Sequence, residues 1–173
     1  MSDPTTTTKL SMTLPTSVYA ALGREANAFR RDIYEHIQRV LAEHVIETES
    51  LPAEEARMIE LMWSLVDRTV DAAKAICREG GFNEDITLRA IERAKQDPRW
   101  IQDYATYVQD DIYKNGNPRK GPINREIGFR IREGIGATVI KDSTGKSATK
   151  KVLGEIIQSY TPMASFDPEA VAV

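Results

Sequence analysis

Residues 8–48 carry the stretch TKLSMTLPTSVYAALGREANAFRRDIYEHIQRVLAEHVIET, which decides the fold of the N-terminal part of the chain. At its start the apolar residues Leu10, Met12 and Leu14 alternate with polar residues. This period of two is the pattern of a β-strand with one buried side. Pro15 then ends the strand, because proline cannot donate to a sheet but suits the first turn of a helix.

Two amphipathic helices are predicted to follow this strand, over about residues 16–28 and about residues 33–48. The carboxylate of Asp32 can accept hydrogen bonds from the free amides at the start of the second helix. The apolar stripes that predict the helices are Val18, Leu22, Ala26 and Phe29, and then Ile33, Ile37, Val40, Leu41, His44 and Val45.

The predicted strand, Lys9–Leu14, needs a partner from outside its own chain. A single strand of this length can neither bury its apolar side nor pair its own backbone groups. A second copy of the chain would supply an antiparallel strand, and the two-stranded ribbon would rest on four helices. Such a ribbon fits the major groove of DNA, where alternate side chains reach the edges of the bases.

The order of these residues resembles the ribbon-helix-helix family of the Arc and MetJ type over about residues 8–46. The resemblance rests on the run Lys9 to Pro15, followed by Val18, Leu22, Ala26, Asp32, Ile37, Val40 and Leu41. It implies a homodimer or higher oligomer that binds DNA, in a prokaryotic or phage setting. Proteins of this kind act as transcriptional regulators, or as accessory proteins of plasmid or phage partition or DNA transfer.

The resemblance also implies which residues contact DNA. It places the base contacts on the outward side of the strand, at Lys9, Ser11 and Thr13. It places the phosphate contacts at the start of the second helix, at Arg30, Arg31, Asp32 and Ile33. Lysine can donate to guanine, and serine or threonine can contact either base, so this trio predicts modest sequence specificity.

Charge is unevenly distributed along the chain, although the net charge is only −3. Residues 1–48 carry five basic and six acidic residues, residues 49–112 carry eight and fourteen, and residues 113–173 carry ten and six. The basic C-terminal segment predicts a possible second patch for phosphate contacts that do not depend on sequence. Its candidate residues are Arg119, Lys120, Arg125, Lys146, Lys150 and Lys151.

The rest of the chain is predicted to be all-helical or nearly all-helical, which gives a mainly α protein with one short N-terminal strand. A long helix is expected to end at Gly80 and Gly81, and two more are expected after the capping residues Asn83 and Asp97. Ile123, Ile127, Ile131 and Ile135 recur every fourth residue. We also expect a short strand at residues 137–140 and a last helix over residues 152–160.

These patterns divide the chain into five parts. They are a disordered arm (1–7), a ribbon-helix-helix module (8–48), an acidic helical region (52–113), a basic and mostly helical region (114–160) and a tail (161–173). The turn-forming residues 115–122 mark the boundary between the acidic and basic regions. A second protein partner is possible through residues 52–160.

No motif in the sequence supports enzyme activity, a metal or a cofactor. The run from Ser143 to Ser147 ends in Gly-Lys-Ser, but Ile140 stands where a phosphate-binding loop requires glycine. A single cysteine, Cys77, can form neither an internal disulfide nor a thiolate metal site. No window approaches the roughly 18 consecutive apolar residues of a membrane span. We therefore expect a cytoplasmic DNA-binding homodimer, and the alternative is a helical assembly or adaptor protein whose N-terminal module only dimerises.

Overall fold

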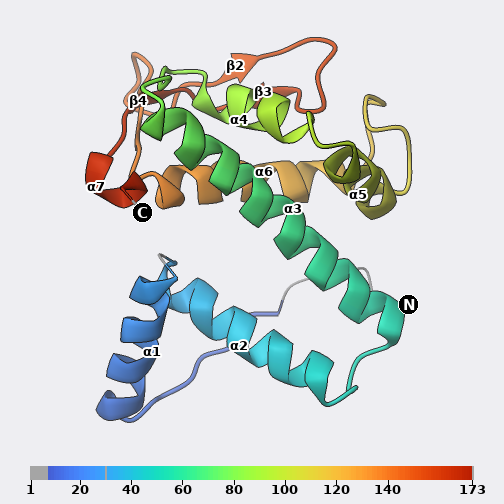
Figure 1. Ribbon diagram of the computed structural model, residues 1–173, viewed down its shortest axis with the longest axis vertical. Helices are drawn as coiled ribbons and strands as arrows, with labels where there is room; N and C mark the ends of the chain where they lie inside the picture. The colour runs from blue at the N-terminus through green and yellow to red at the C-terminus, as the bar shows by residue number, and fades with distance from the viewer. Residues whose placement is uncertain (1–7, 30, 173) are drawn as a thin grey trace. The chain divides into compact units, whose positions relative to one another are not determined.

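The computed structural model describes residues 8–29 and 31–172, and the chain divides into two units, Met1–Glu60 and Leu61–Val173. The described residues form seven helices and four short strands, so the protein is mainly helical (Figure 1). None of the helices in this part of the chain is both long and apolar enough to cross a membrane. The arm predicted at residues 1–7 lies outside the described residues.

The N-terminal unit contains a pair of helices at the predicted positions, α1 (Thr16–Ala28) and α2 (Ile33–Glu47). The two helices approach each other closely at Gly23, where an added Cβ would lie 3.6 Å from the Cδ1 atom of Ile33. A polar contact also joins them, because the Oε2 atom of Glu25 lies 3.1 Å from the Nε2 atom of His36.

Residues 8–15 form neither helix nor strand in this single chain, so the strand predicted for residues 9–14 is absent from it. All the strands among the described residues lie in the C-terminal unit. The physical reason is the one that the sequence suggests, since a lone segment has no second strand to bond with. Leu10 is consequently 71% exposed, and Met12 is also exposed.

Helix α3 (Ala53–Arg78) is the predicted long helix, and the boundary between the two units falls within it. It ends as the sequence indicates, at a left-handed glycine. Gly80 has a φ of 73° and donates its N–H to the carbonyl of Cys77, while Gly81 donates to the carbonyl of Ile76 at 2.9 Å. These two bonds satisfy carbonyls at the helix end in the Schellman arrangement.

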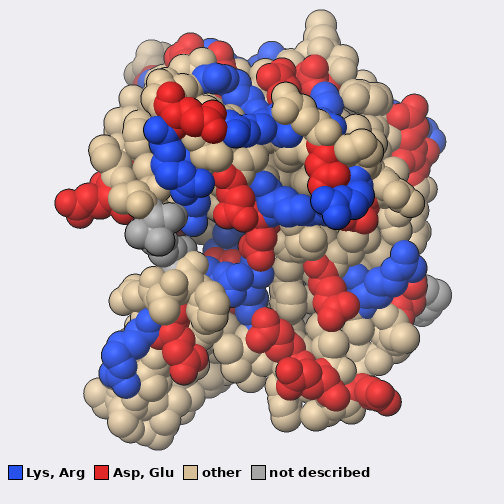
Figure 2. Space-filling model, viewed as in Figure 1, with Lys and Arg blue, Asp and Glu red and all other residues tan. Residues whose placement is uncertain are grey.

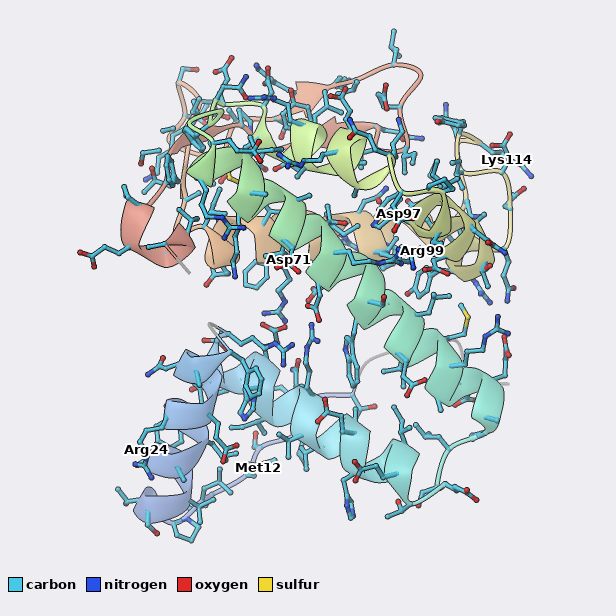
Figure 3. The ribbon with its side chains drawn as sticks, in the orientation of Figure 1. Met12, Arg24, Asp71, Asp97, Arg99 and Lys114 are labelled. Atoms are coloured by element: carbon cyan, nitrogen blue, oxygen red, sulfur yellow. The ribbon has the colours of Figure 1, made fainter. Side chains whose placement is uncertain are left out.

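Two shorter helices follow, α4 (Ile86–Ala94) and α5 (Pro98–Val108). The side chain of Asp97 accepts from the backbone N–H of Arg99 and caps α5 as predicted, and the two residues lie together at its start (Figure 3). Asn83 does not cap α4. Its side chain accepts from the N–H of Asp85, which itself occupies the N-cap position.

Helix α5 is shorter than its apolar pattern suggests. It ends at Val108, because the next residue, Gln109, takes the left-handed conformation with a φ of 54°. Ile112, whose spacing from Tyr104 and Val108 would continue the apolar side of this helix, therefore lies beyond it.

The core of the C-terminal unit forms around α6 (Lys120–Gly134). Its four regularly spaced isoleucines, Ile123, Ile127, Ile131 and Ile135, are fully buried. Trp100 and Tyr104 of α5 are buried as well, and each finds a partner for its polar atom. Trp100 donates to the Oγ1 atom of Thr69 at 3.1 Å, and Tyr104 donates to the Oδ1 atom of Asn124 at 2.8 Å.

The helix predicted for residues 152–160 is wrong, because this stretch belongs to a β-hairpin. Strand β2 (Lys150–Lys151) pairs antiparallel with β3 (Ser159–Tyr160). Gly154 in the connection has a φ of 76°, which lies in the left-handed region and is incompatible with a continuous α-helix. The region after α6 is therefore not nearly all-helical.

The tail predicted for residues 161–173 is also wrong where the structure describes it. The predicted strand near residue 138 is present as β1 (Thr138–Val139), and it pairs with β4 (Met163–Ser165). Helix α7 (Pro168–Val171) follows. Met163 and Val171 are buried, and Arg78 of α3 donates to the carbonyl of Val171 at 3.3 Å. The acidic and basic regions predicted as separate parts thus belong to one unit, Leu61–Val173.

Alanine substitutions at two glycines of α6 are expected to change the stability of the protein in opposite directions. An added Cβ at Gly128 meets no atom within 4 Å, whereas one at Gly134 would lie 2.7 Å from the Cγ1 atom of Val70. We expect Gly128→Ala to raise the free energy of unfolding by up to about 1 kcal/mol, because alanine favours the helix. We expect Gly134→Ala to lower it by about 1–3 kcal/mol through overpacking. Urea denaturation of both variants measures these changes, and equal stabilities would contradict the close packing of α6 against α3.

Candidate nucleic-acid interface

The predicted base-contacting residues Lys9, Ser11 and Thr13 are all exposed in the segment that leads into α1. Met12, which alternates with them, is exposed as well; Figure 3 labels it. The side chains of the polar series are thus accessible to a ligand. In the apolar series, which would face the helices in a ribbon, Leu10 and Met12 are also exposed in the single chain, and Leu14 is half-buried.

At the start of α2, a carboxylate already bonds two of the backbone amides that a phosphate site would offer. The Oδ1 atom of Asp32 accepts from the N–H of Tyr34 at 2.8 Å and from that of Glu35 at 3.4 Å. A capping carboxylate of this kind occupies amides that would otherwise attract a phosphate group. Ile33 begins the helix and offers only its backbone.

Of the two arginines before α2 that are predicted to contact phosphate, the structure describes only Arg31. Arg30 lies outside the described residues. The guanidinium of Arg31 lies over the ring of Phe29, 5.2 Å from its centroid, and Phe29 stacks on His36 with 5.9 Å between ring centroids. Phe29 is nevertheless largely exposed. A cation held over an exposed aromatic ring can still present charge to a partner.

Three residues of the predicted basic patch, Lys120, Arg119 and Lys150, are engaged in structural contacts. Lys120 is buried, and its Nζ atom donates to the carbonyls of Ile112 at 2.6 Å and Lys114 at 3.0 Å. Burial lowers the pKa of the Lys120 ammonium, although Asp110 and Asp111 oppose this shift. Arg119 donates to the carbonyl of Tyr107 at 3.3 Å.

Lys150 forms a network that anchors the β2–β3 hairpin. Its Nζ atom lies 2.6 Å from carboxylate oxygens of both Glu84 and Asp85, and the Tyr160 hydroxyl donates to Asp85 at 2.7 Å. The hydrogen bonds from Lys150 and Tyr160 lower the pKa of the Asp85 carboxyl. Lys150 is therefore largely neutralised by its neighbours and contributes little free charge.

The remaining patch residues, Arg125, Lys146 and Lys151, are exposed, and the described residues place no carboxylate in ion-pair contact with them. Acidic and basic side chains alternate over the visible face of the C-terminal unit rather than separating into two regions (Figure 2). The predicted patch is thus divided between the start of α6 and the surroundings of β2.

A groove within the C-terminal unit is lined by two of the patch residues, Lys120 and Arg125, and has a volume of about 730 Å³. One face of α6 forms a wall, with Gly121, Arg125, Gly128, Phe129 and Arg132. The lining also includes the hydroxyl side chains Ser147, Thr149, Ser159 and Thr161, which follow α6 in the chain. Val139, Ile156, Ile157 and Met163 contribute apolar lining. Sequence reasoning missed this groove, although the spacing of Arg125, Gly128 and Arg132 opposite the isoleucines was a signal for one wall.

The run from Asp142 to Ser147 forms a closed turn and not a phosphate-binding loop. The Oδ1 atom of Asp142 accepts from the backbone N–H groups of Thr144 at 2.8 Å and Lys146 at 3.1 Å. A carboxylate therefore occupies the amides that a phosphate would need. Within residues 8–29 and 31–172, no three His, Cys, Asp or Glu side chains gather in a way that could hold a metal ion.

No protein-family model, curated protein or solved structure matches this chain.

Substitution of Lys120 tests whether its buried ammonium stabilises the start of α6. We expect Lys120→Met to lower the free energy of unfolding by about 1–3 kcal/mol, because two carbonyls lose their buried donor. Lys141→Met is the matched control at an exposed position, and it should change stability by no more than about 0.5 kcal/mol. Denaturant titration of both variants measures the difference. A Lys120 variant as stable as the control would contradict a structural role for this ammonium.

Proposed function

We propose that this protein is a DNA-binding homodimer that inserts an antiparallel ribbon, made from residues 9–14 of two chains, into the major groove. The observation that carries the proposal is the open apolar surface of the N-terminal unit. Leu10, Met12, Val18, Val40 and Leu41 are all exposed in the single chain. These are residues that the ribbon-helix-helix pattern assigns to the interior of a dimer.

A second copy of the chain is the occupant that best fits this surface. Residues 8–14 carry unpaired backbone groups, and another copy of the same segment offers complementary groups across a twofold axis. Within residues 8–29 and 31–48, Ala26 is the one apolar side chain that is fully buried. A unit with so little apolar interior gains stability by covering its exposed residues with a partner.

Pairing in this way turns Lys9, Ser11 and Thr13 of both chains to the same outer face. Lysine donates to guanine O6 and N7, and threonine offers a hydroxyl and a methyl group to the bases. The chain then acts as a sequence-specific regulator, or as an accessory DNA-binding protein of partition or transfer.

The alternative proposal is a helical adaptor whose N-terminal unit only dimerises. One observation favours it, namely the Asp32 carboxylate that already bonds the amides of Tyr34 and Glu35. The near-neutral charge of residues 1–48 points the same way, since DNA-binding modules are commonly basic.

Dimerisation is tested by placing one charge on either side of the predicted strand. We expect Leu10→Glu to convert the dimer to a monomer, because the carboxylate would be buried between the ribbon and the helices. Ser11→Glu, on the outer side, is the matched control and should remain dimeric. Light scattering of the intact chain gives the mass of each variant, and a wild-type chain that is monomeric at micromolar concentration would overturn the proposal.

DNA binding is tested by fluorescence anisotropy on random duplex DNA at about 50 mM and about 200 mM salt, followed by selection of the preferred sequence. We expect wild-type binding to weaken steeply with salt, because released counterions drive it. The Lys9→Ala/Thr13→Ala variant should lose sequence preference while remaining dimeric. If dimeric wild-type protein fails to bind at low salt, the adaptor function replaces the DNA-binding one.

A further inference from the structure

The groove beside α6 differs from the rest of the surface in its charge. Its lining includes Arg125, Arg132 and the buried Lys120, whose ammonium already donates to two carbonyls, and the described residues that line it include no aspartate or glutamate. This is unusual in a chain with 26 acidic and 23 basic residues. A concave surface with cations and without carboxylates favours an anionic ligand. Its volume of about 730 Å³ is also within the range of small-molecule sites.

Arg125 is the best placed of these cations to bind an anion. Its Nε atom donates to the carbonyl of Gly121 at 3.3 Å, which orients the side chain along α6. No hydrogen bond from the described residues engages its two terminal nitrogens. A guanidinium presented in this way can donate to two oxygens of one phosphate group. Arg132, in contrast, donates to Glu133 and is partly neutralised.

The Arg132 guanidinium lies over the ring of Phe129, and both residues line the groove. The Arg132 guanidinium lies 4.9 Å from the centroid of the Phe129 ring, and that of Arg130 lies 5.2 Å from it. Phe129 remains 42% exposed despite its apolar character. Aromatic rings and guanidinium planes are the groups on which proteins stack nucleobases. This stacked pair therefore suits a planar ring in addition to an anion.

Thr87 supplies an independent sign of a missing partner. This lining residue is only 3% exposed, and its Oγ1 atom makes no hydrogen bond to any described residue. A buried hydroxyl without a partner is unfavourable, so a ligand with donor and acceptor groups on its edge would satisfy it. A nucleobase has such an edge.

The backbone of α6 is also accessible from the groove. An added Cβ at Gly121 or at Gly128 meets no atom within 4 Å, so both glycines face open space. A ligand can thus approach the helix more closely than a row of larger side chains would allow.

From these features we infer that the groove binds a nucleotide, with its phosphate at Arg125 and its base stacked on the Phe129–Arg132 pair. The nucleotide is either free or part of a single strand, since both present the same phosphate and base. This site is separate from the proposed ribbon and does not depend on it.

Isothermal titration calorimetry of the intact chain tests the inference. The probes are adenosine 5′-monophosphate, adenosine, inorganic phosphate, single-stranded hexathymidylate and a hexaglutamate peptide. We expect the monophosphate or hexathymidylate to bind at least about 10-fold more tightly than adenosine or phosphate alone, since one site takes both groups. Preference for the monophosphate identifies a free nucleotide, and preference for hexathymidylate identifies a single strand.

Three variants assign the binding to the groove. We expect Arg125→Gln and Gly128→Leu each to weaken binding at least about 10-fold, through loss of a charged hydrogen bond and through filling of the groove. Thr87→Val should weaken it by about 3-fold or more. The control is Arg99→Gln, an exposed arginine on α5 outside the groove, which should bind as wild type does. Melting temperatures measured in parallel identify any variant that fails to fold.

The inference is overturned if neither nucleotide probe binds at millimolar concentration. It is also overturned if folded Gly128→Leu protein binds them as wild type does, because the ligand then sits elsewhere. Binding of hexaglutamate without either nucleotide would replace the nucleotide with an acidic peptide as the ligand.

Discussion

The C-terminal unit depends on a single row of side chains, the isoleucines that recur every fourth residue along α6. Ile123, Ile127, Ile131 and Ile135 are fully buried, and burial of branched aliphatic side chains is the largest favourable term in folding. Because successive residues of a helix are turned by about 100°, burying this row leaves the opposite side of α6 free. Arg125 and Gly128 lie on that free side, and the groove forms beside it. The same periodicity thus supplies both the core and one wall of the candidate site.

The helices of the N-terminal unit, in contrast to those of the C-terminal unit, enclose little apolar surface. The Glu25–His36 contact joins α1 to α2, but Leu10, Val40 and Leu41 remain exposed. In the proposed dimer these residues form a core to which both chains contribute. Folding and dimerisation of this unit would then be one process, and its stability would depend on protein concentration.

Local charge, and not net charge, distinguishes the candidate sites in this mildly acidic chain. Lys120 and Lys150 contribute to the positive count of the C-terminal segment, yet one bonds to backbone carbonyls and the other to two carboxylates. The cations that stay available are those that have no carboxylate partner among the described residues, such as Arg125. A count of charges along the sequence cannot separate these cases, because partners such as Glu84 are distant in the chain from Lys150.

The sequence alone determined the elements that depend on neighbouring residues. The Asp32 and Asp97 caps, the glycines after α3 and the isoleucine row all act within a few residues, and the structure contains each of them. Only the tertiary structure decided the β2–β3 hairpin, because residues 150–160 carry an apolar spacing that a helix or a hairpin can accommodate. The tertiary structure also decided which residues come together to line the groove. Arg125 was a candidate from its charge, but Thr87 and the hydroxyl residues of the lining come from segments far apart in sequence. Only long-range packing brings them together.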